Sequence, residues 1–383
     1  MHWCLVTVSL LVALTSISAT ADDQAAQAIR TLRAAGPRAE GAAAARSAVD
    51  LLLQGGQDSL LPILHGFRDA SPLAVNWLRS AFERTADRER KAGRPLPRAQ
   101  MLEFVRDLSG SPAARRLAYE SLLHDDASLE QTLIPEMLLD PSPEFRRDAV
   151  ARLLTEAAAA TDKAASLQLY RQALQGAVHQ DQVKTIATAL RGDGQAVDLQ
   201  RHFGFLTEWR VIGPFDNKEE KGYAVIYPPE ELLDLQGEYD GQLGKVRWEP
   251  ISTTDDFGII DIASQISNHK GSLMYLTTTF SSTDERTVEI RLGTPNAWKL
   301  WVNGRPVFER EEYHRSSQMD QYRIPAEFRS GANVILLKLC QNEQTQEWAQ
   351  KYEFQLRISD ATGAALLPTL TSAQRLLPSL GRN

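Results

Sequence analysis

The chain has 383 residues, of which 43% are hydrophobic and 24% are charged, and its formal net charge is −7 at pH 7. That length predicts two domains, because single hydrophobic cores seldom grow beyond about 250–300 residues. The negative charge argues against nucleic acid as a partner, since the chain has no basic field to attract phosphate groups.

The N-terminal residues have the pattern of a secretory signal. Leu5 to Ile17 is mostly apolar, and Ala19-Thr-Ala21 has the small-x-small form of a signal peptidase site. The alternative is a membrane anchor, but the apolar run is shorter than the roughly 20 residues that a span needs. We therefore expect removal of residues 1–21, export to the periplasm or the extracellular medium, and no membrane span after cleavage.

Residues 22–199 have the composition of a helical domain, rich in Ala, Leu, Arg and Glu. A Ser-Pro start recurs about every 30 to 40 residues, a spacing typical of helical hairpin arrays. Ser is placed to cap each helix, and Pro suits the first turn. The three starts are at Ser71, Ser111 and Ser142.

The third copy, from Asp140 to Leu153, resembles a HEAT-type repeat helix, with its acidic-Pro opening and its Arg-Arg-Asp-Ala-Val run. The resemblance implies a solenoid of stacked repeats that leaves a surface free for a protein partner. We expect Leu153 to Leu174 to form one long Ala-rich helix. Arg191-Gly-Asp-Gly194 is interpreted as a helix end and linker, although Arg-Gly-Asp is also an adhesion tripeptide. This break in the helical pattern places the domain boundary between Gly192 and Phe205.

The chain after Phe205 has the pattern of an antiparallel sandwich. Thr287 to Leu292 and Tyr352 to Ile358 alternate strictly between apolar and polar residues, and turn residues recur about every ten positions. Leu273 to Phe280 has high β-propensity, and Trp209 to Phe215 reads as a short strand that Gly-Pro ends. The fold class is therefore a helical repeat solenoid followed by a β-sandwich of the jelly-roll type.

One hairpin of the sandwich carries a family resemblance. Trp298 to Phe308 contains Asn303-Gly304, which suits a type I′ turn between two strands. Gly331 to Leu339 follows as a glycine turn that opens an apolar strand, as in the middle of a sheet. Together they resemble the non-catalytic jelly-roll domains of the galactose-binding-like superfamily, found beside the catalytic barrels of β-galactosidases and β-glucuronidases and in many carbohydrate-binding modules.

The resemblance covers about residues 205–362. The opening Trp209-Arg-Val-Ile-Gly-Pro-Phe-Asp216 also resembles the entry to sandwiches in exported multidomain bacterial proteins, particularly those of planctomycetes. No catalytic barrel accompanies the sandwich here. Residues 363–383, which include two prolines, are expected to be a loosely ordered tail.

The sequence has no familiar catalytic motif. It lacks a Gly-x-Ser-x-Gly elbow, a phosphate-binding loop, a dinucleotide fingerprint and a His-Glu-x-x-His pair. The seven histidines are scattered, so a zinc site would have to be assembled entirely by the fold. Cleavage of the leader would leave Cys340 as the one cysteine, which we expect to be a buried apolar side chain.

Two groups of carboxylates are candidate ligands. Glu309, Glu311 and Glu312 follow the hairpin, and the ordinary interpretation is a solvated hairpin end with Arg310 and Arg315. A second group lies earlier in the sandwich and consists of Asp255, Asp256 and Asp261. Superfamily members often hold a structural calcium ion, so calcium is the one cofactor considered for this group. A loop whose aspartates cap its own backbone fits as well.

Trp301 is the sequence's best candidate for a sugar-stacking platform. Alternation in the strand sends Trp298 to the core and leaves Trp301 on the other face with Lys299 and Asn303. Sugar rings stack on an indole while neighbouring amine and amide groups bond their hydroxyls. The alternative is a half-buried packing tryptophan, which we also expect for Trp348 and the remaining strand-end tryptophans.

Three functions are compatible with these sequence features. The first is a non-catalytic exported protein in which the sandwich binds a glycan or polysaccharide and the helical repeats bind a protein. The second is a purely structural interaction module of an envelope complex. The third is a glycoside hydrolase or its accessory subunit, which would need two convergent carboxylates in a cleft.

Overall fold

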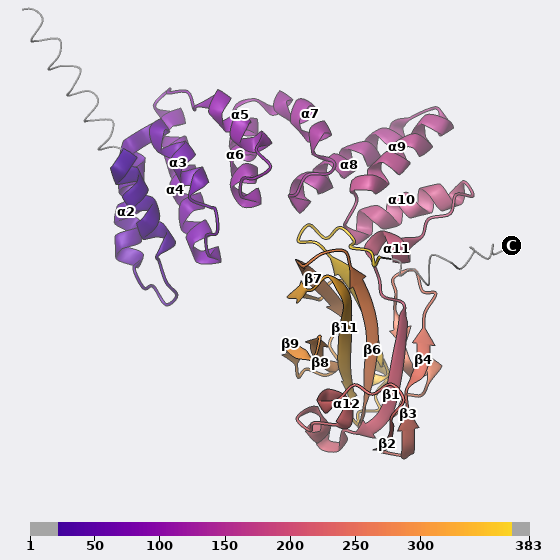
Figure 1. Cartoon of the computed structure of the whole chain (residues 1–383). Helices are drawn as coiled ribbons and strands as arrows, with labels where there is room; N and C mark the ends of the chain where they lie inside the picture. The colour runs from indigo at the N-terminus through magenta and orange to yellow at the C-terminus, as the bar shows by residue number, and fades with distance from the viewer. Residues whose placement is uncertain (1–21, 370–383) are drawn as a thin grey trace, which may run out of the picture. The chain divides into compact units, whose positions relative to one another are not determined.

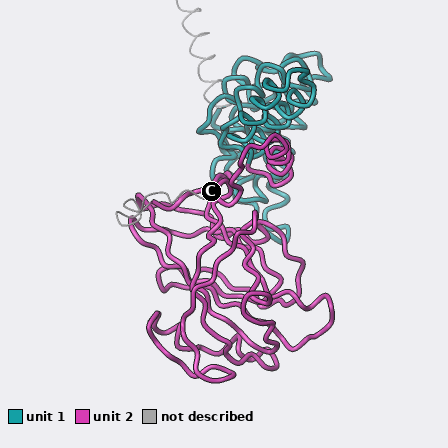
Figure 2. The backbone as a smooth tube through the Cα atoms, turned by 90° about the vertical axis from the view of Figure 1, so that its right-hand side faces the viewer, with its two compact units in different colours: residues 1–177 teal, residues 178–383 magenta. Residues whose placement is uncertain are grey.

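The computed structural model describes residues 22–369, so the predicted leader and most of the predicted tail lie outside the described residues. It divides into two compact units, residues 1–177 and residues 178–383 (Figure 2). The composition change in the sequence lies later, between Gly192 and Phe205. Among the described residues, no helix is both long and apolar enough to cross a membrane.

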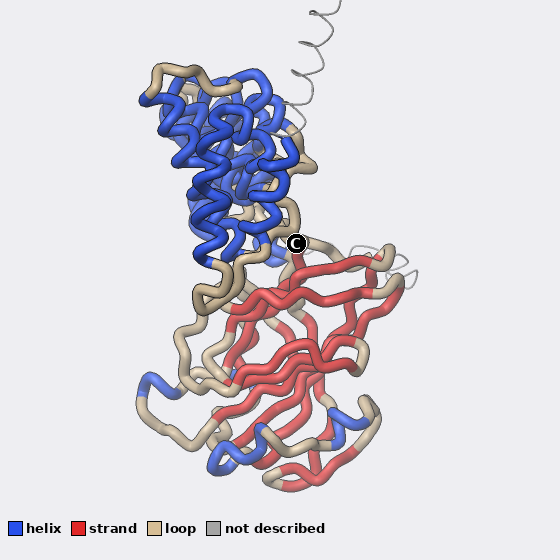
Figure 3. Tube along the Cα trace, turned by 90° about the vertical axis from the view of Figure 1, so that its left-hand side faces the viewer, coloured by secondary structure: helices blue, strands red, loops and turns tan. Residues whose placement is uncertain are grey.

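The first unit is built of helices (Figures 1 and 3), which are α-helices with short 3₁₀ turns between some of them. Its apolar faces stack into one continuous cluster that runs from residue 28 to residue 149. After a helix over residues 22–33, the longer helices are α2 Ala42–Gly55, α4 Pro72–Lys91, α5 Arg98–Arg106, α6 Pro112–Asp125, α8 Pro143–Ala159 and α9 Lys163–Gly176. The shorter elements are η1 Gly56–Ser59, α3 Leu60–His65, η2 Ala127–Leu129, α7 Glu130–Leu133 and η3 Ile134–Met137.

The three Ser-Pro starts are confirmed as helix starts, but they are capped differently. Ser71, Ser111 and Ser142 are the N-caps of α4, α6 and α8, each followed by proline. Only Ser71 uses its hydroxyl as a cap, accepting from Ala74 N at 3.2 Å. Ser142 instead donates its backbone N–H to Asp140, at 2.7 Å.

The expected single helix from Leu153 to Leu174 is wrong. Helix α8 ends at Ala159, and Asp162 is the N-cap of α9, where its side chain accepts from Ala165 N at 2.8 Å. An aspartate N-cap satisfies an N–H group that a continuous helix would bond internally, so its side chain favours a new start. The two helices then pack as a hairpin, as a repeat array requires.

The second unit contains two packed sheets. A six-stranded antiparallel sheet has the order β4-β1-β6-β11-β8-β9, and a four-stranded sheet has the order β10-β7-β12-β5. Their strands are β1 Glu208–Asp216, β4 Glu249–Ser252, β5 Ile260–Asp261, β6 Ser272–Ser282, β7 Arg286–Gly293, β8 Ala297–Val302, β9 Arg305–Arg310, β10 Tyr322–Phe328, β11 Gly331–Gln341 and β12 Glu353–Ser359. The fold class is therefore the expected one, a helical solenoid followed by an antiparallel sandwich.

The hairpin prediction is also confirmed. Asn303 has φ 52° and Gly304 has φ 75°, the two positive values that a type I′ turn demands. The apolar strand β11 lies inside the sheet, between β6 and β8. By contrast, Gly213-Pro214 does not end β1 as expected, because the strand continues to Asp216 past an irregularity in register.

Each face of the six-stranded sheet carries its own apolar cluster. The inner face meets the four-stranded sheet around Trp298, Leu337 and Leu356, which are wholly buried. The outer face is covered by residues 217–248, whose Tyr223 and Trp248 pack against the sheet. That segment contains η4 Lys218–Tyr223, α12 Pro228–Glu231 and the hairpin of β2 Glu238–Gly241 with β3 Gly244–Arg247.

The helices α10 Gln180–Gly192 and α11 Leu199–Phe203 belong to the second unit. Arg191 pairs with Asp256, and Gln200 donates to the carbonyls of Thr253 and Asp255. These contacts explain why the unit starts before the composition changes. Asp193 is the C-cap of α10, so the Arg-Gly-Asp tripeptide is a helix end, as expected.

Candidate functional site

The alternation predicted for β8 is confirmed. Trp298, Leu300 and Val302 are buried in the core between the sheets. Trp301 is half-buried and packs against the cluster on the outer face of the same sheet. The indole therefore lies on the expected face, but residues 217–248 already contribute aromatic and apolar neighbours to it.

The polar groups beside Trp301 are engaged with the protein. Lys299 Nζ lies 3.0 Å from a Glu309 carboxylate oxygen and 4.4 Å from the centre of the Tyr223 ring. Asn303 donates from Nδ2 to Asn333 Oδ1 at 2.9 Å and accepts on Oδ1 from Val334 N at 3.0 Å. Asn303 thus ties the hairpin turn to β11. A ligand role for Trp301, Lys299 and Asn303 remains a prediction.

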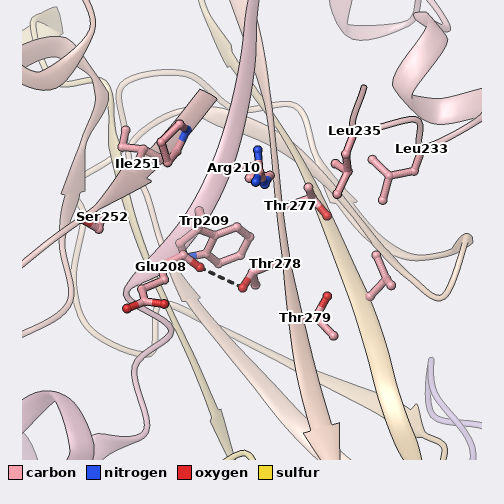
Figure 4. A pocket seen from close by; sticks show the side chains of 12 residues that line it. Glu208, Trp209, Arg210, Leu233, Leu235, Ile251, Ser252, Thr277, Thr278 and Thr279 are labelled. Carbon is pink, nitrogen blue, oxygen red and sulfur yellow. Dashed lines mark hydrogen bonds between the residues drawn. The ribbon is translucent and has the colours of Figure 1, made fainter. Parts of the chain in front are cut away.

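A groove of about 610 Å³ crosses the outer face of the same sheet (Figure 4). Arg210 and Thr277 lie in register on β1 and β6, with Leu233 and Leu235 also lining the groove. Across the strands, Thr277 on β6 pairs with Leu336 on β11, which in turn pairs with Trp301 on β8. The Thr277 hydroxyl donates to the Ile335 carbonyl at 2.9 Å, and the Thr278 hydroxyl donates to the Glu208 carbonyl at 2.8 Å.

Trp348 is the exposed tryptophan, contrary to the expectation that it packs. Its side chain is 61% exposed, on the short 3₁₀ turn η5 Glu347–Ala349. Among residues 22–369, no other tryptophan is counted with the exposed large apolar residues. Exposure of this ring leaves unrealised the about 1.5–3 kcal/mol that burial of a large apolar side chain contributes.

The turn that carries Trp348 is anchored on both sides of the indole. Ala349 is fully buried, and its carbonyl accepts from Lys270 Nζ at 2.7 Å. Gln350 donates to the carbonyls of Thr345 and Gln346. Asn268 in turn donates to the Gln350 carbonyl at 2.9 Å. Burial lowers the pKa of Lys270. These contacts fix the backbone and leave the ring outside.

A chain of polar side chains lies against the exposed indole. The His314 ring meets Trp348 edge to face, with ring centres 5.2 Å apart. His314 Nε2 lies 2.6 Å from Asn342 Oδ1, and Asn342 Nδ2 donates to Glu220 Oε1 at 2.9 Å. Because Asn342 Oδ1 also accepts from Gln344 N, His314 Nε2 is the donor in this contact, and in a neutral imidazole the Nδ1 is then an acceptor.

The base of this region is buried and polar. Asn217 is fully buried and donates to the Tyr313 hydroxyl and to the Gln341 carbonyl, both at 3.1 Å. Its Oδ1 is buried without a hydrogen-bond partner. Burial raises the pKa of Tyr313, which keeps its hydroxyl neutral.

Backbone strain gathers in the same place. Glu219, Glu220 and His314 have φ values of 56°, 62° and 55°, in the left-handed region that favours glycine. The Glu219 N–H donates to Glu343 Oε1, which holds this conformation. Strained residues of this kind cluster at ligand sites, where the surrounding structure fixes them. We define Trp348, His314, Asn342 and Glu220 as the Trp348 site.

The aspartates considered as calcium ligands have protein partners. Asp255 accepts from Phe257 N at 2.9 Å and Asp261 caps a short helix through Ser264 N at 3.0 Å, so both cap their own backbone. Asp256 pairs with Arg191. In the part of the chain from 22 to 369, no three His, Cys, Asp or Glu side chains gather as a metal site would need.

The carboxylates after the hairpin behave as a solvated end. Glu312 lies 2.9 Å from Arg310 and 3.0 Å from Arg315, and the Arg310 hydrogen bond lowers the pKa of Glu312. Glu309 pairs with Lys299, as described above, and Glu311 is exposed. This arrangement matches the ordinary interpretation made from the sequence.

Comparison with known proteins identifies no family. The sequence matches no protein-family model and no curated protein. Among solved structures, a β-glucosidase from Kluyveromyces marxianus is similar over 43% of this chain and 19% of its own, with 4% identity and a TM-score of 0.26. An α-xylosidase of family GH31 from Xanthomonas citri is similar over 41% and 16%, with 11% identity and a TM-score of 0.18. The chain spans less than a fifth of either protein, and at these TM-scores neither likeness carries an argument.

Proposed function

We propose that this protein is a non-catalytic binding protein whose β-sandwich holds a glycan at the Trp348 site and whose helical unit binds a protein. The observation that supports the glycan most strongly is the 61% exposed indole on an anchored turn. No bond is made or broken in this function. Binding rests on stacking and hydrogen bonding alone.

The chemistry of the Trp348 site suits a sugar ring. The C–H face of a pyranose packs on an indole face, as apolar groups do on aromatic rings. His314 Nδ1 can accept from one hydroxyl, and the Glu220 carboxylate, already oriented by Asn342, can accept from another. An aromatic face beside acceptors fits the hydroxyl-rich, uncharged surface of a glycan.

The anchored turn also reduces the cost of binding. A loop that must be ordered by its ligand costs free energy that is subtracted from the affinity. Here Lys270, Asn268 and Gln350 hold the turn before any ligand arrives. The indole is therefore presented in one orientation, as a stacking platform requires.

The proposal is tested on a glycan array with the full chain, with and without calcium. We expect saturable binding by the parent protein, loss of binding in Trp348→Ala, and retention in Trp301→Ala. Both variants are first shown to be folded by near-UV circular dichroism. Loss in Trp301→Ala with retention in Trp348→Ala would move the site to the outer face of the sheet.

A purely structural interaction module is the second candidate. The segment that covers the outer face exposes Ile226 at 67%, Leu232 at 71% and Leu243 at 71%. Exposed apolar groups that gather on one segment are typical of protein contacts. Absence of binding by the parent protein across a broad polysaccharide panel would favour this function.

The exported location belongs to the same proposal. It rests on the small-x-small pattern at Ala19-Thr-Ala21. N-terminal sequencing of the protein recovered from its native cells should give Asp22 as the first residue. An intact Met1 start would contradict the cleavage.

A further inference from the structure

The described part of the chain ends beside the six-stranded sheet. Thr369 donates both its N–H and its hydroxyl to the Ser281 carbonyl of β6, each at 2.9 Å. Three residues earlier, the Leu366 N–H donates to the Ile358 carbonyl of β12 at 3.0 Å. These hydrogen bonds fix the point from which residues 370–383 start.

Two hollows of the sandwich adjoin at this point. One has a volume of about 370 Å³ and is lined by residues 367–369, by α11 and by the end of β6. The other is the groove of about 610 Å³ on the outer face of the sheet (Figure 4). Glu208, Thr278 and Thr279 line both hollows. The groove therefore begins next to the end of the described chain.

The groove has an apolar wall that is open to solvent. Leu233 and Leu235 form it, and we call them the leucine wall. Figure 4 shows Thr277 of β6 beside Leu235. Leu233 is partly exposed and Leu235 is 37% exposed. Apolar side chains that gather in a groove favour an apolar occupant.

The length of β6 decides which part of the 370–383 segment reaches the wall. Ser281 and Thr277 are four residues apart on this strand, which is about 13 Å at the rise of a β-strand. An extended chain covers about 3.3–3.6 Å per residue, so residues 370–374 can span this distance. Leu376 and Leu377 follow soon after and can therefore reach the leucine wall.

The composition of the 370–383 segment suits such a groove. Four of its fourteen residues are leucine, and none is acidic. Repulsion from the exposed carboxylate of Glu208, where the two hollows adjoin, is therefore absent. Pro378 favours an extended backbone at Leu377, which suits a segment that lies along a strand.

We propose that residues 370–383 bind in the groove of their own chain and place Leu376 and Leu377 on the leucine wall. Tethering favours this occupant over a free one, because a short linker gives an effective concentration of about 1 mM. A segment whose free peptide binds with a Kd of about 100 µM would then fill the groove about nine-tenths of the time. The proposal does not depend on the Trp348 site.

The test measures fluorescence polarisation of a labelled peptide of residues 370–383 with two full chains. One is the parent, and the other carries Leu376→Ser and Leu377→Ser, which should empty the groove. We expect the peptide to bind the serine chain about tenfold more tightly than the parent, whose groove is already filled. Equal affinity for the two chains, or no binding to the serine chain, would overturn the proposal.

A variant of the leucine wall locates the binding. Leu235→Ser, added to the serine chain, should weaken the peptide about tenfold. Leu243→Ser is the matched control, because Leu243 belongs to the same segment 217–248, is 71% exposed and does not line the groove. Near-UV circular dichroism confirms that both variants are folded. Equal effects of the two substitutions would overturn the site.

A changed peptide tests the same contact without altering the protein. The peptide with serine at positions 376 and 377 should not bind the serine chain. Binding as tight as that of the unchanged peptide would overturn the role of the two leucines.

Trypsin cleavage after Arg375 separates a segment bound within its own chain from one exchanged between two copies. We expect the parent to be cut there about tenfold more slowly than Leu235→Ser, equally at low and at high protein concentration. Protection that appears only at high concentration would assign the segment to a second copy and overturn the proposal. Trp348→Ala should be cut as slowly as the parent, so that failure of the glycan function leaves this result intact.

Discussion

Lys338 holds residues 217–248 onto the sandwich, and replacing it with methionine should lower the free energy of unfolding of the second unit. Lys338 is fully buried on β11. Its ammonium group donates to the Tyr223 and Val225 carbonyls at 3.1 and 2.7 Å and to Glu230 Oε1 at 2.8 Å. Burial lowers the pKa of Lys338, and the Glu230 carboxylate opposes that shift.

The expected magnitude follows from what the substitution leaves behind. Methionine keeps most of the apolar stem but leaves the Glu230 carboxylate, whose side chain is only 10% exposed, without its counter-ion, and two carbonyls without a donor. Removing one partner of a buried ion pair costs about 3–5 kcal/mol. The Lys338→Met, Glu230→Gln double variant should recover more than half of this loss, because no uncompensated charge then remains.

Lys299→Met is the matched control. Lys299 lies directly opposite Lys338 in the register of β8 with β11, and it pairs with an exposed Glu309. An ion pair that is partly exposed to water contributes about 0–1 kcal/mol. The two substitutions are chemically identical and occur on neighbouring strands, so the difference between them measures burial of the ion pair.

Urea unfolding followed by tryptophan fluorescence measures the effect. Trp77 is the one tryptophan of residues 22–177, while five lie in the second unit, so the signal reports mainly the sandwich. The midpoint for Lys338→Met should fall well below that of Lys299→Met, with a similar slope. A difference of less than about 1 kcal/mol between the two variants would refute the reasoning.

Three further results are expected. Ser71→Ala should destabilise the helical unit by about 1 kcal/mol in thermal unfolding, whereas Ser111→Ala, which removes no cap hydrogen bond, should cost much less; equal losses would contradict this. Burial alone would raise the pKa of Asp320, but its hydrogen bonds to Arg357 and Arg291 outweigh burial and lower it. The stability it contributes is therefore complete above about pH 4 and is lost as pH falls through the depressed value, so Asp320→Asn should lower stability at pH 7 and flatten the acid limb of a pH titration of unfolding. Burial raises the pKa of Cys340 to about 12, so its thiol should not react with iodoacetamide at pH 8 in the native protein. Peptide mapping should therefore find Cys340 unmodified after treatment of the native protein and modified after treatment of the urea-unfolded protein.

Features encoded by neighbouring residues could be predicted from the sequence. The alternation of β8 placed Trp298 in the core, and Asn303-Gly304 specified the turn, because both depend on local backbone geometry. The Ser-Pro starts were likewise visible. The break at Asp162 was missed because the alanine composition around it favours helix on both sides.

The Trp348 site could not be predicted, because its parts meet only in the fold. His314, Asn342 and Glu220 come from three separate segments. The exposure of Trp348 depends on Lys270 and Asn268, which lie far away in sequence and anchor its turn. Composition alone favours a buried tryptophan, so only the tertiary hydrogen bonds show that the ring stays outside.

Glycan-array binding of the full chain beside folded Trp348→Ala and Trp301→Ala variants tests the central proposal most directly. The proposal predicts saturable binding that disappears in Trp348→Ala and persists in Trp301→Ala. Undiminished binding by Trp348→Ala, or no binding by the parent to any polysaccharide tested, would contradict it.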